Sequence, residues 1–247
     1  MVLAALAALI APASPSTADE IPRVGLFGDS VGFSLLFALA SAIVTPDFVR
    51  TGSDVTLGCG IAVSPMPPPE EPHLCDDPAG RYALTAAVGD VTVAIMISCQ
   101  WELVPQPIPG SADGLTRVIG GDEFDRYVRE QYDLIADALT AAGVERILWT
   151  RCPYMSEVTG VHGLSLFFRA SRDPDRMDHL NTIIDAVAAE RDDVDVLPFD
   201  AWVNRRVDDP SIRPDGSHYE WRVHNDAADA FIQIVNDELA GEAASAS

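Results

Sequence analysis

The chain of 247 residues is long enough for one well-buried α/β domain, and nothing in its composition marks a second domain. Its 38 acidic and 16 basic residues give a formal net charge of −22, and all the basic residues are arginine. This balance argues against a nucleic-acid partner and against an anionic membrane surface, because no basic stripe is present to neutralise phosphates. We interpret the acidity as a solubility feature.

An apolar run, VLAALAALI, occupies residues 2–10 and is too short to span a bilayer; Ala-Pro-Ala follows at residues 11–13. The pattern is typical of a secretory signal, although no Lys or Arg precedes Arg23. The alternatives are a misplaced start codon, or a chain cut from a membrane protein just after its last transmembrane helix. All three interpretations predict an extracytoplasmic protein in which residues 1–22 are a signal-like or membrane-proximal segment and linker.

The first strand is predicted at Val24–Phe27, a short apolar run, and Gly28-Asp29-Ser30 breaks it before a helix-compatible segment. Ser30 is therefore expected at the carboxyl end of a strand and beside a helix N-terminus, whose free N–H groups stabilise a developing anion. This position makes Ser30 a candidate nucleophile. The alternative is a serine that only caps the helix.

A second strand is predicted at Phe48–Leu57, followed by the turn Gly58-Cys59-Gly60, whose glycines let the backbone approach a ligand closely. Cys59 and Cys75 bracket a proline-rich loop that has no apolar period. We predict a disulfide between them, which by the chain-entropy argument contributes about 3 kcal/mol.

The clearest strand is Val91–Ser98, whose unbroken apolar run indicates burial on both faces. Cys99 follows it directly, and Cys152 follows a further predicted strand. The two thiols meet if these strands are neighbours; otherwise they are simply buried.

The rest of the chain alternates helices and strands. The loop Val104–Gly121 is expected to be a lid or binding loop without regular structure. The remaining predicted elements are helices at Tyr82–Val88, Asp122–Ala142, Asp175–Arg191, Ala201–Arg205 and His224–Leu239, and strands at Val144–Thr150 and Val194–Leu197. Five strands alternating with helices predict a three-layer α/β/α sandwich with a parallel sheet.

An acid and a histidine three residues apart, Asp215 and His218, precede the last predicted helix. An activated serine needs an imidazole to take its proton and a carboxylate to orient that imidazole, and this one turn supplies both. The other histidines are less suited to the role of base: His73 lies in the proline-rich loop, His162 in a glycine-flanked loop, His179 within a predicted helix and His224 at a helix start. No metal or nucleotide motif is present, so we expect neither a metal nor another cofactor.

Gly-Asp-Ser after a first strand, with Asp-x-x-His before a final helix, resembles the SGNH (GDSL-like) hydrolase family from about Val24 to Leu239. The resemblance implies a flavodoxin-like strand order 2-1-3-4-5, in which Ser30, the Gly58–Gly60 turn and the Gln100-Trp101 segment ring one crevice. It also implies that the N–H groups of Ser30 and of Gly58 or Gly60 form an oxyanion hole.

One part of the family pattern is missing. The family usually has Gly-x-Asn-Asp after the third strand, with the Asn completing the oxyanion hole, whereas this chain has Cys99-Gln100-Trp101-Glu102. Losing such a donor typically costs about 3 kcal/mol of transition-state stabilisation. Gln100 is a candidate replacement. Trp101 either stacks on a sugar face or packs at the rim of the pocket.

From this resemblance we expect an SGNH-like domain at residues 23–240 and a disordered tail at 241–247. The expected activity is that of a serine esterase or O-acyltransferase acting on O-acetyl or other acyl esters of surface glycans. Ser30 is the expected nucleophile, His218 the base and Asp215 its orienting acid. Some members of the family are fused to membrane acyltransferases, so attachment to such a protein is one expectation; a monomer is another. The alternatives are a catalytically weak glycan-binding domain and, less favoured, a lipase.

Overall fold

The computed structural model describes residues 21–38, 48–61, 75–108, 111, 113–156, 172–222 and 225–245. Its centre is a parallel sheet of five strands in the order β2-β1-β3-β6-β7. The strands are β1 (Arg23–Gly28), β2 (Val49–Val55), β3 (Val93–Ile97), β6 (Arg146–Thr150) and β7 (Val194–Leu197). The predicted fold class and strand order are therefore confirmed.

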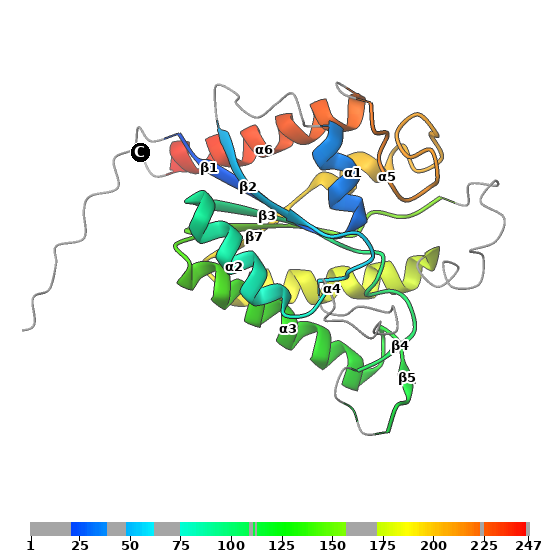
Figure 1. Ribbon diagram of the computed structural model, residues 1–247. Helices are drawn as coiled ribbons and strands as arrows, with labels where there is room; N and C mark the ends of the chain where they lie inside the picture. The colour runs from blue at the N-terminus through cyan, green and yellow to red at the C-terminus, as the bar shows by residue number, and fades with distance from the viewer. Residues whose placement is uncertain are drawn as a thin grey trace, which may run out of the picture.

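Helices cover both faces of the sheet (Figure 1). One face carries α1 (Ser30–Ala38), α5 (Phe199–Asn204) and α6 (Asp226–Ser245), and the other carries α2 (Pro78–Gly89), α3 (Asp122–Ala141) and α4 (Pro174–Glu190). The two hydrophobic cores between these three layers bury both faces of the central strands.

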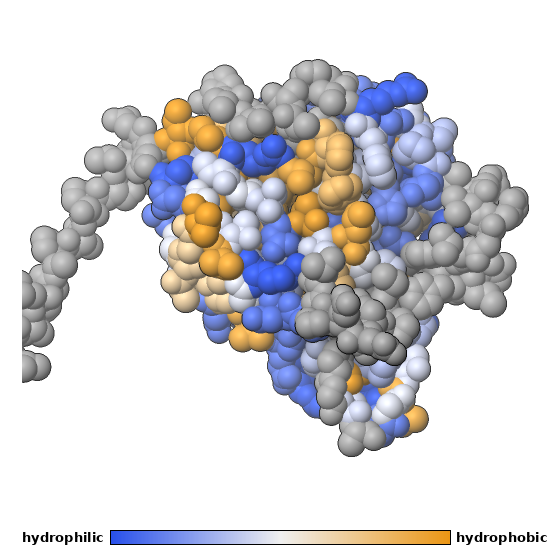
Figure 2. Space-filling view, in the orientation of Figure 1, coloured by the Kyte–Doolittle hydropathy of each residue, from blue (hydrophilic) through white to orange (hydrophobic). Residues whose placement is uncertain are grey.

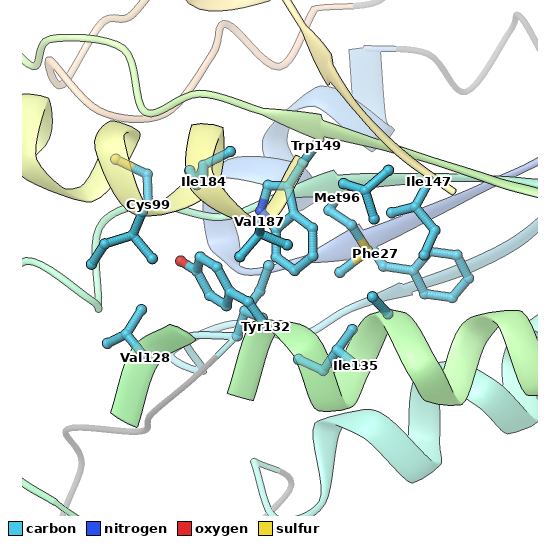
Figure 3. Close-up of a cluster of buried hydrophobic side chains, with 14 of the residues drawn as sticks. Phe27, Met96, Cys99, Val128, Tyr132, Ile135, Ile147, Trp149, Ile184 and Val187 are labelled. Carbon is cyan, nitrogen blue, oxygen red and sulfur yellow. The ribbon is translucent and has the colours of Figure 1, made fainter. Parts of the chain in front are cut away.

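Alternation along the strands sends neighbouring side chains to opposite cores. In β3, Ile95 packs toward α1 and α6, whereas Met96 packs toward α3 and α4. Figure 3 shows this second core, where Phe27 and Met96 from the sheet lie near Trp149 and the α3 residue Tyr132. Burial on both faces explains why the central strands are continuously apolar.

Several boundaries differ from those expected. The 104–121 loop contains a small antiparallel hairpin, β4 (Gln106–Pro107) with β5 (Thr116–Arg117). Helix α2 starts at Pro78, because the Asp77 carboxylate accepts the N–H of Gly80 at 3.0 Å and caps the helix. Helix α6 continues to Ser245, so the tail expected to be disordered is largely helical.

The signal-like segment falls mostly outside the described residues, since the structure describes nothing before residue 21. Among the helices that are described, none combines the length and apolar character needed to cross a bilayer.

Candidate active site

The turn that carries Ser30 is fixed by the end of β1. Gly28 pairs with Val55 of β2 and Ile97 of β3, so the carboxyl ends of three strands meet there. Gly28 has φ +150°, and a Cβ at this position would lie 1.8 Å from the carbonyl oxygen of Ile97. Only glycine therefore lets β1 stay paired with β3 while the chain turns into α1.

Asp29, and not Ser30, caps helix α1. Its Oδ1 accepts the N–H of Val31 at 2.8 Å, while Ser30 is the first residue of the helix. The Ser30 hydroxyl is instead 2.9 Å from Nε2 of His218. The alternative that Ser30 serves only as a helix cap is thus not what the structure shows.

The second half of the site is the turn from Arg213 to His218. Oδ2 of Asp215 lies 2.6 Å from Nδ1 of His218, and Oδ1 accepts the backbone N–H of Ser217 at 2.9 Å and of His218 at 2.7 Å. Gly216 has φ +83°, and a Cβ there would lie 2.5 Å from the carbonyl oxygen of Ser156. The structure thus brings Ser30, His218 and Asp215 into one hydrogen-bonded chain.

The two acid–base groups have opposite pKa shifts. Burial lowers the pKa of His218, but the hydrogen bond and charge of Asp215, together with the charge of Asp29, outweigh it and raise that pKa above 6.5. Burial acts to raise the pKa of Asp215, and the bonds from His218 and the backbone hold it at about 2. Asp215 is therefore ionised across the physiological range, as an orienting acid must be.

Neighbouring segments hold the His218 turn in place. The N–H of Tyr219 donates to Oγ of the buried Ser34 on α1 at 3.0 Å. The guanidinium of the buried Arg213 donates to the carbonyl oxygen of Tyr154, and the N–H of Ser156 donates to that of Gly216 at 3.3 Å. The His218 turn is thus supported by both α1 and the 151–156 segment after β6.

The predicted oxyanion donors lie at the same sheet edge as Ser30. Gly58 and Gln100 each stand three residues beyond a strand residue that pairs with Gly28. Within the described residues, no acceptor bonds the N–H of Ser30, Gly58 or Gly60 or the side-chain amide of Gln100. Gln100 is buried, with 4% of its surface exposed.

Trp101 is 8% exposed. An indole that stacks on a sugar needs an open face, so this burial favours packing over the expected substrate contact.

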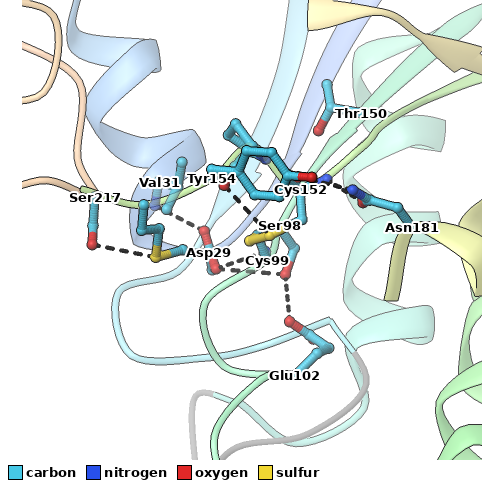
Figure 4. The surroundings of a disulfide bond; sticks show 12 residues. Asp29, Val31, Ser98, Cys99, Glu102, Thr150, Cys152, Tyr154, Asn181 and Ser217 are labelled. Atoms are coloured by element: carbon cyan, nitrogen blue, oxygen red, sulfur yellow. Dashed lines mark hydrogen bonds between the residues drawn. A yellow bond between two sulfur atoms is a disulfide. The ribbon is translucent and has the colours of Figure 1, made fainter. Parts of the chain in front are cut away.

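A buried polar cluster beside Ser30 was not predicted from the sequence. Oδ2 of the fully buried Asp29 accepts the N–H of Cys99 at 3.3 Å and contacts Oγ of Ser98, which is also 3.0 Å from Oε2 of the fully buried Glu102 (Figure 4). Burial raises the pKa of Asp29. Polar residues directly after an apolar strand were the available sequence signal for this cluster.

Both cysteine pairs form disulfides. The predicted Cys59–Cys75 bond is confirmed, and Cys99 and Cys152, for which the sequence allows either a bond or simple burial, are bonded as well. The second bond joins the ends of β3 and β6, next to Asp29 (Figure 4). The side chain of Asn181 on α4 bonds both the N–H and the carbonyl of Cys152, at 2.7 and 3.0 Å, which fixes that end of the bridge.

Of the other four histidines, the structure describes His179. His179 pairs with Asp125 of α3 at 2.7 Å, between two helices. His73, His162 and His224 lie outside the described residues. In the part of the chain that is described, no cluster of His, Cys, Asp and Glu has the arrangement of a metal site.

No protein-family model matches the chain, and no curated protein does. Among solved structures it is similar to an α/β-hydrolase enzyme from the metagenome of Lake Arreo, Spain, with 15% identity and a TM-score of 0.47, over 90% of this chain and 95% of that one. A gut microbial diltiazem-metabolizing enzyme is similar at 12% identity and a TM-score of 0.49, over 89% of this chain and 47% of that one. The N-terminal part of a Bacteroides fragilis protein, containing a phosphatase domain and complexed with Mg, is similar at 8% identity and a TM-score of 0.42, over 90% of this chain and 52% of that one.

This chain therefore spans about half the length of the second and third of those chains. Similarity at these values supports no inference about activity.

Proposed function

We propose that the protein is a serine-dependent esterase or O-acyltransferase of the SGNH type that acts through an acyl-serine intermediate. The observation that carries the proposal is the chain from Ser30 Oγ to His218 Nε2 at 2.9 Å and from His218 Nδ1 to Asp215 Oδ2 at 2.6 Å. This is the order of nucleophile, base and orienting acid that serine catalysis requires.

In the proposed reaction, Oγ of Ser30 bonds to the ester carbonyl carbon while Nε2 of His218 takes the hydroxyl proton. The N–H of Ser30, one N–H of the Gly58–Gly60 turn and the Gln100 amide stabilise the negative oxygen. His218 then returns the proton to the departing alcohol as its bond to carbon breaks. Water, or a sugar hydroxyl in a transferase, repeats these steps on the acyl-serine.

The proposal extends to substrate and place. We propose acyl esters of surface or extracellular glycans, O-acetyl groups among them, as substrates, on the resemblance of the Gly-Asp-Ser and Asp-x-x-His segments. Two disulfides favour an oxidising compartment outside the cytoplasm. We also propose that the protein is a monomer, either free or attached to a membrane acyltransferase.

Labelling with a fluorophosphonate probe, read by mass spectrometry of the tryptic peptides, tests the nucleophile. We expect one adduct, on Ser30, and none in Ser30→Ala. Ser53→Ala, which removes an exposed serine of β2, is the matched control and should label like wild type. Labelling of another serine would refute the assignment of Ser30, and no labelling of the folded wild type would favour a catalytically weak binding domain.

Hydrolysis and transfer are separated by the fate of the acyl group. With p-nitrophenyl acetate as donor and methyl glucopyranoside as acceptor, an esterase yields acetate at all acceptor concentrations. A transferase yields the acetylated glucoside in proportion to the acceptor.

A further inference from the structure

Three aromatic side chains form an open surface beside the candidate active site. The rings of Phe37 and Trp221 are stacked, with centroids 5.9 Å apart and an interplanar angle of 22°. Phe33 meets both edge-on, at 4.9 Å from Phe37 and 6.4 Å from Trp221. Phe37 is 46% exposed and Trp221 56% exposed, so the cluster faces solvent. We call these three residues the aromatic platform.

The platform is attached to both halves of the site. Phe33 and Phe37 are three and seven residues after Ser30 in α1, a spacing that places them on the same face of the helix as the nucleophile. Trp221 stands three residues after His218, and the bond from the Tyr219 N–H to Oγ of Ser34 holds this segment against α1. Figure 2 shows hydrophobic residues gathered over α1.

The position of the base decides which half of an ester would reach the platform. His218 must return its proton to the alcohol oxygen, so that oxygen approaches Nε2 in the tetrahedral intermediate. The carbonyl oxygen is directed instead to the donors that follow β2 and β3. On this geometry the alcohol would leave on the side of α1 and of the segment after His218, which are the two segments that carry the platform.

The shape of the platform favours a ring over a chain. A flexible alkyl group needs an enclosed apolar groove, whereas stacked and exposed aromatic rings offer a flat surface to the C–H face of another ring. The chain's net charge of −22 disfavours an anionic ligand. A neutral pyranose meets both conditions.

We propose that Phe33, Phe37 and Trp221 form a subsite that binds the pyranose ring of the alcohol half of an ester substrate. The inference rests on the proposed function, because it uses Ser30 and His218 as nucleophile and base. In this inference Trp221, and not the buried Trp101, contacts the sugar.

Two acetates with the same acyl group test the subsite: methyl 6-O-acetyl-glucopyranoside and ethyl acetate. In Trp221→Ala we expect KM for the sugar ester to rise about threefold to tenfold, with kcat within about twofold of wild type. The kcat/KM for ethyl acetate should change less than about twofold. Trp221→Phe should recover most of the affinity, and Phe37→Ala should resemble Trp221→Ala.

Leu134→Ala is the matched control, because Leu134 is a 51% exposed apolar residue on α3, across the sheet. This variant should leave KM and kcat for both acetates at their wild-type values. Equal effects of Trp221→Ala on the two acetates would overturn the subsite while leaving the esterase proposal intact. Sensitivity of this variant to acyl length, measured with butyrate esters, would assign the platform to the acyl half instead and overturn the proposal as well.

A binding measurement separates the subsite from catalysis. Saturation-transfer NMR of the sugar ester with Ser30→Ala protein should show saturated ring protons, and the signal should be lost in Ser30→Ala/Trp221→Ala. This readout decides the subsite even if the wild type hydrolyses neither acetate, a result that would count against the proposed function alone. No ring saturation with Ser30→Ala protein would overturn the subsite.

Discussion

The backbone N–H of Cys99 donates to Oδ2 of Asp29 at 3.3 Å, which couples the end of β3 to the residue directly before Ser30. Cys99 is also bonded through its sulfur to Cys152, beyond the end of β6. A displacement of the disulfide would therefore also displace the turn that carries Ser30.

The Cys99–Cys152 bridge is also connected to the turn that carries His218, through residues 152–156. That segment accepts a hydrogen bond from Arg213 and donates one to the carbonyl oxygen of Gly216. Covalent and hydrogen bonds thus connect the turns of Ser30 and His218 through one disulfide. We therefore expect the bridge to help fix the relative positions of Ser30 and His218.

We predict that reducing the Cys99–Cys152 bond lowers kcat for p-nitrophenyl acetate by about tenfold to a hundredfold, because small displacements of reacting groups are costly. The change should also destabilise the fold by about 4 kcal/mol on the chain-entropy estimate for this loop. The measurement is kcat with and without a phosphine reductant. Circular dichroism verifies that the reduced protein is folded.

Two variants assign the effect to that bond. Cys99→Ser/Cys152→Ser should show the low kcat and no response to reductant. Cys59→Ser/Cys75→Ser, which removes the other bridge, should still lose activity when reductant is added. A folded Cys99→Ser/Cys152→Ser protein with wild-type kcat would mean that the bridge does not position the site.

Removing either end of the proton path should abolish turnover. We predict that Ser30→Ala and His218→Ala each lower kcat/KM for p-nitrophenyl acetate at least about a thousandfold, because a triad acts as a unit. The double variant should be no worse than the single ones. Losses that multiplied in the double variant would contradict joint action of Ser30 and His218.

A variant of Gln100 tests whether its amide takes the place of the missing asparagine in the oxyanion hole. If it replaces the missing asparagine, Gln100→Ala should lower kcat by about a hundredfold and leave KM nearly unchanged, since the bond forms only in the transition state. Gln106→Ala is the control, because that buried amide bonds the carbonyl oxygens of Trp101 and Val104. A loss below about threefold in Gln100→Ala would exclude Gln100 as a donor.

Periodicity and glycine placement were enough to predict the layers of this fold. The apolar run of Val93–Ile97 and the helical period of α3 each indicated the correct element, because burial alone determines both patterns. The Asp215–His218 pair could also be predicted, since its members lie in one turn.

Other parts of the site depend on contacts that spacing does not encode. The aromatic platform joins Phe37 to Trp221 across most of the chain, and tertiary contacts such as the bond between Tyr219 and Ser34 bring those segments together. The place of Trp101 in the motif suggested a sugar contact, but tertiary packing buries this side chain. The Asp29–Ser98–Glu102 cluster likewise needs the pairing of β1 with β3.

The pH dependence of activity follows from the two shifts in the site. Because His218 must be neutral to accept the Ser30 proton, kcat/KM should be low below its pKa and should rise with pH to a plateau. Asp215 raises that pKa above the ordinary histidine value of 6.5, so we expect a single limb with its midpoint above that of a free histidine. Asp215 itself, with a pKa of about 2, adds no limb in this range.

Asp215→Asn tests the assignment. Without the carboxylate, burial acts on His218 with less opposition, so its pKa falls and the limb should move to lower pH. The plateau should drop at least about a hundredfold, because the imidazole is no longer held in the productive tautomer. Asp125→Asn, which removes the 2.7 Å partner of His179 away from the site, should change neither limb nor plateau. A plateau within about twofold of wild type in Asp215→Asn would show that Asp215 does not orient His218, and the base would have to be sought elsewhere in the chain.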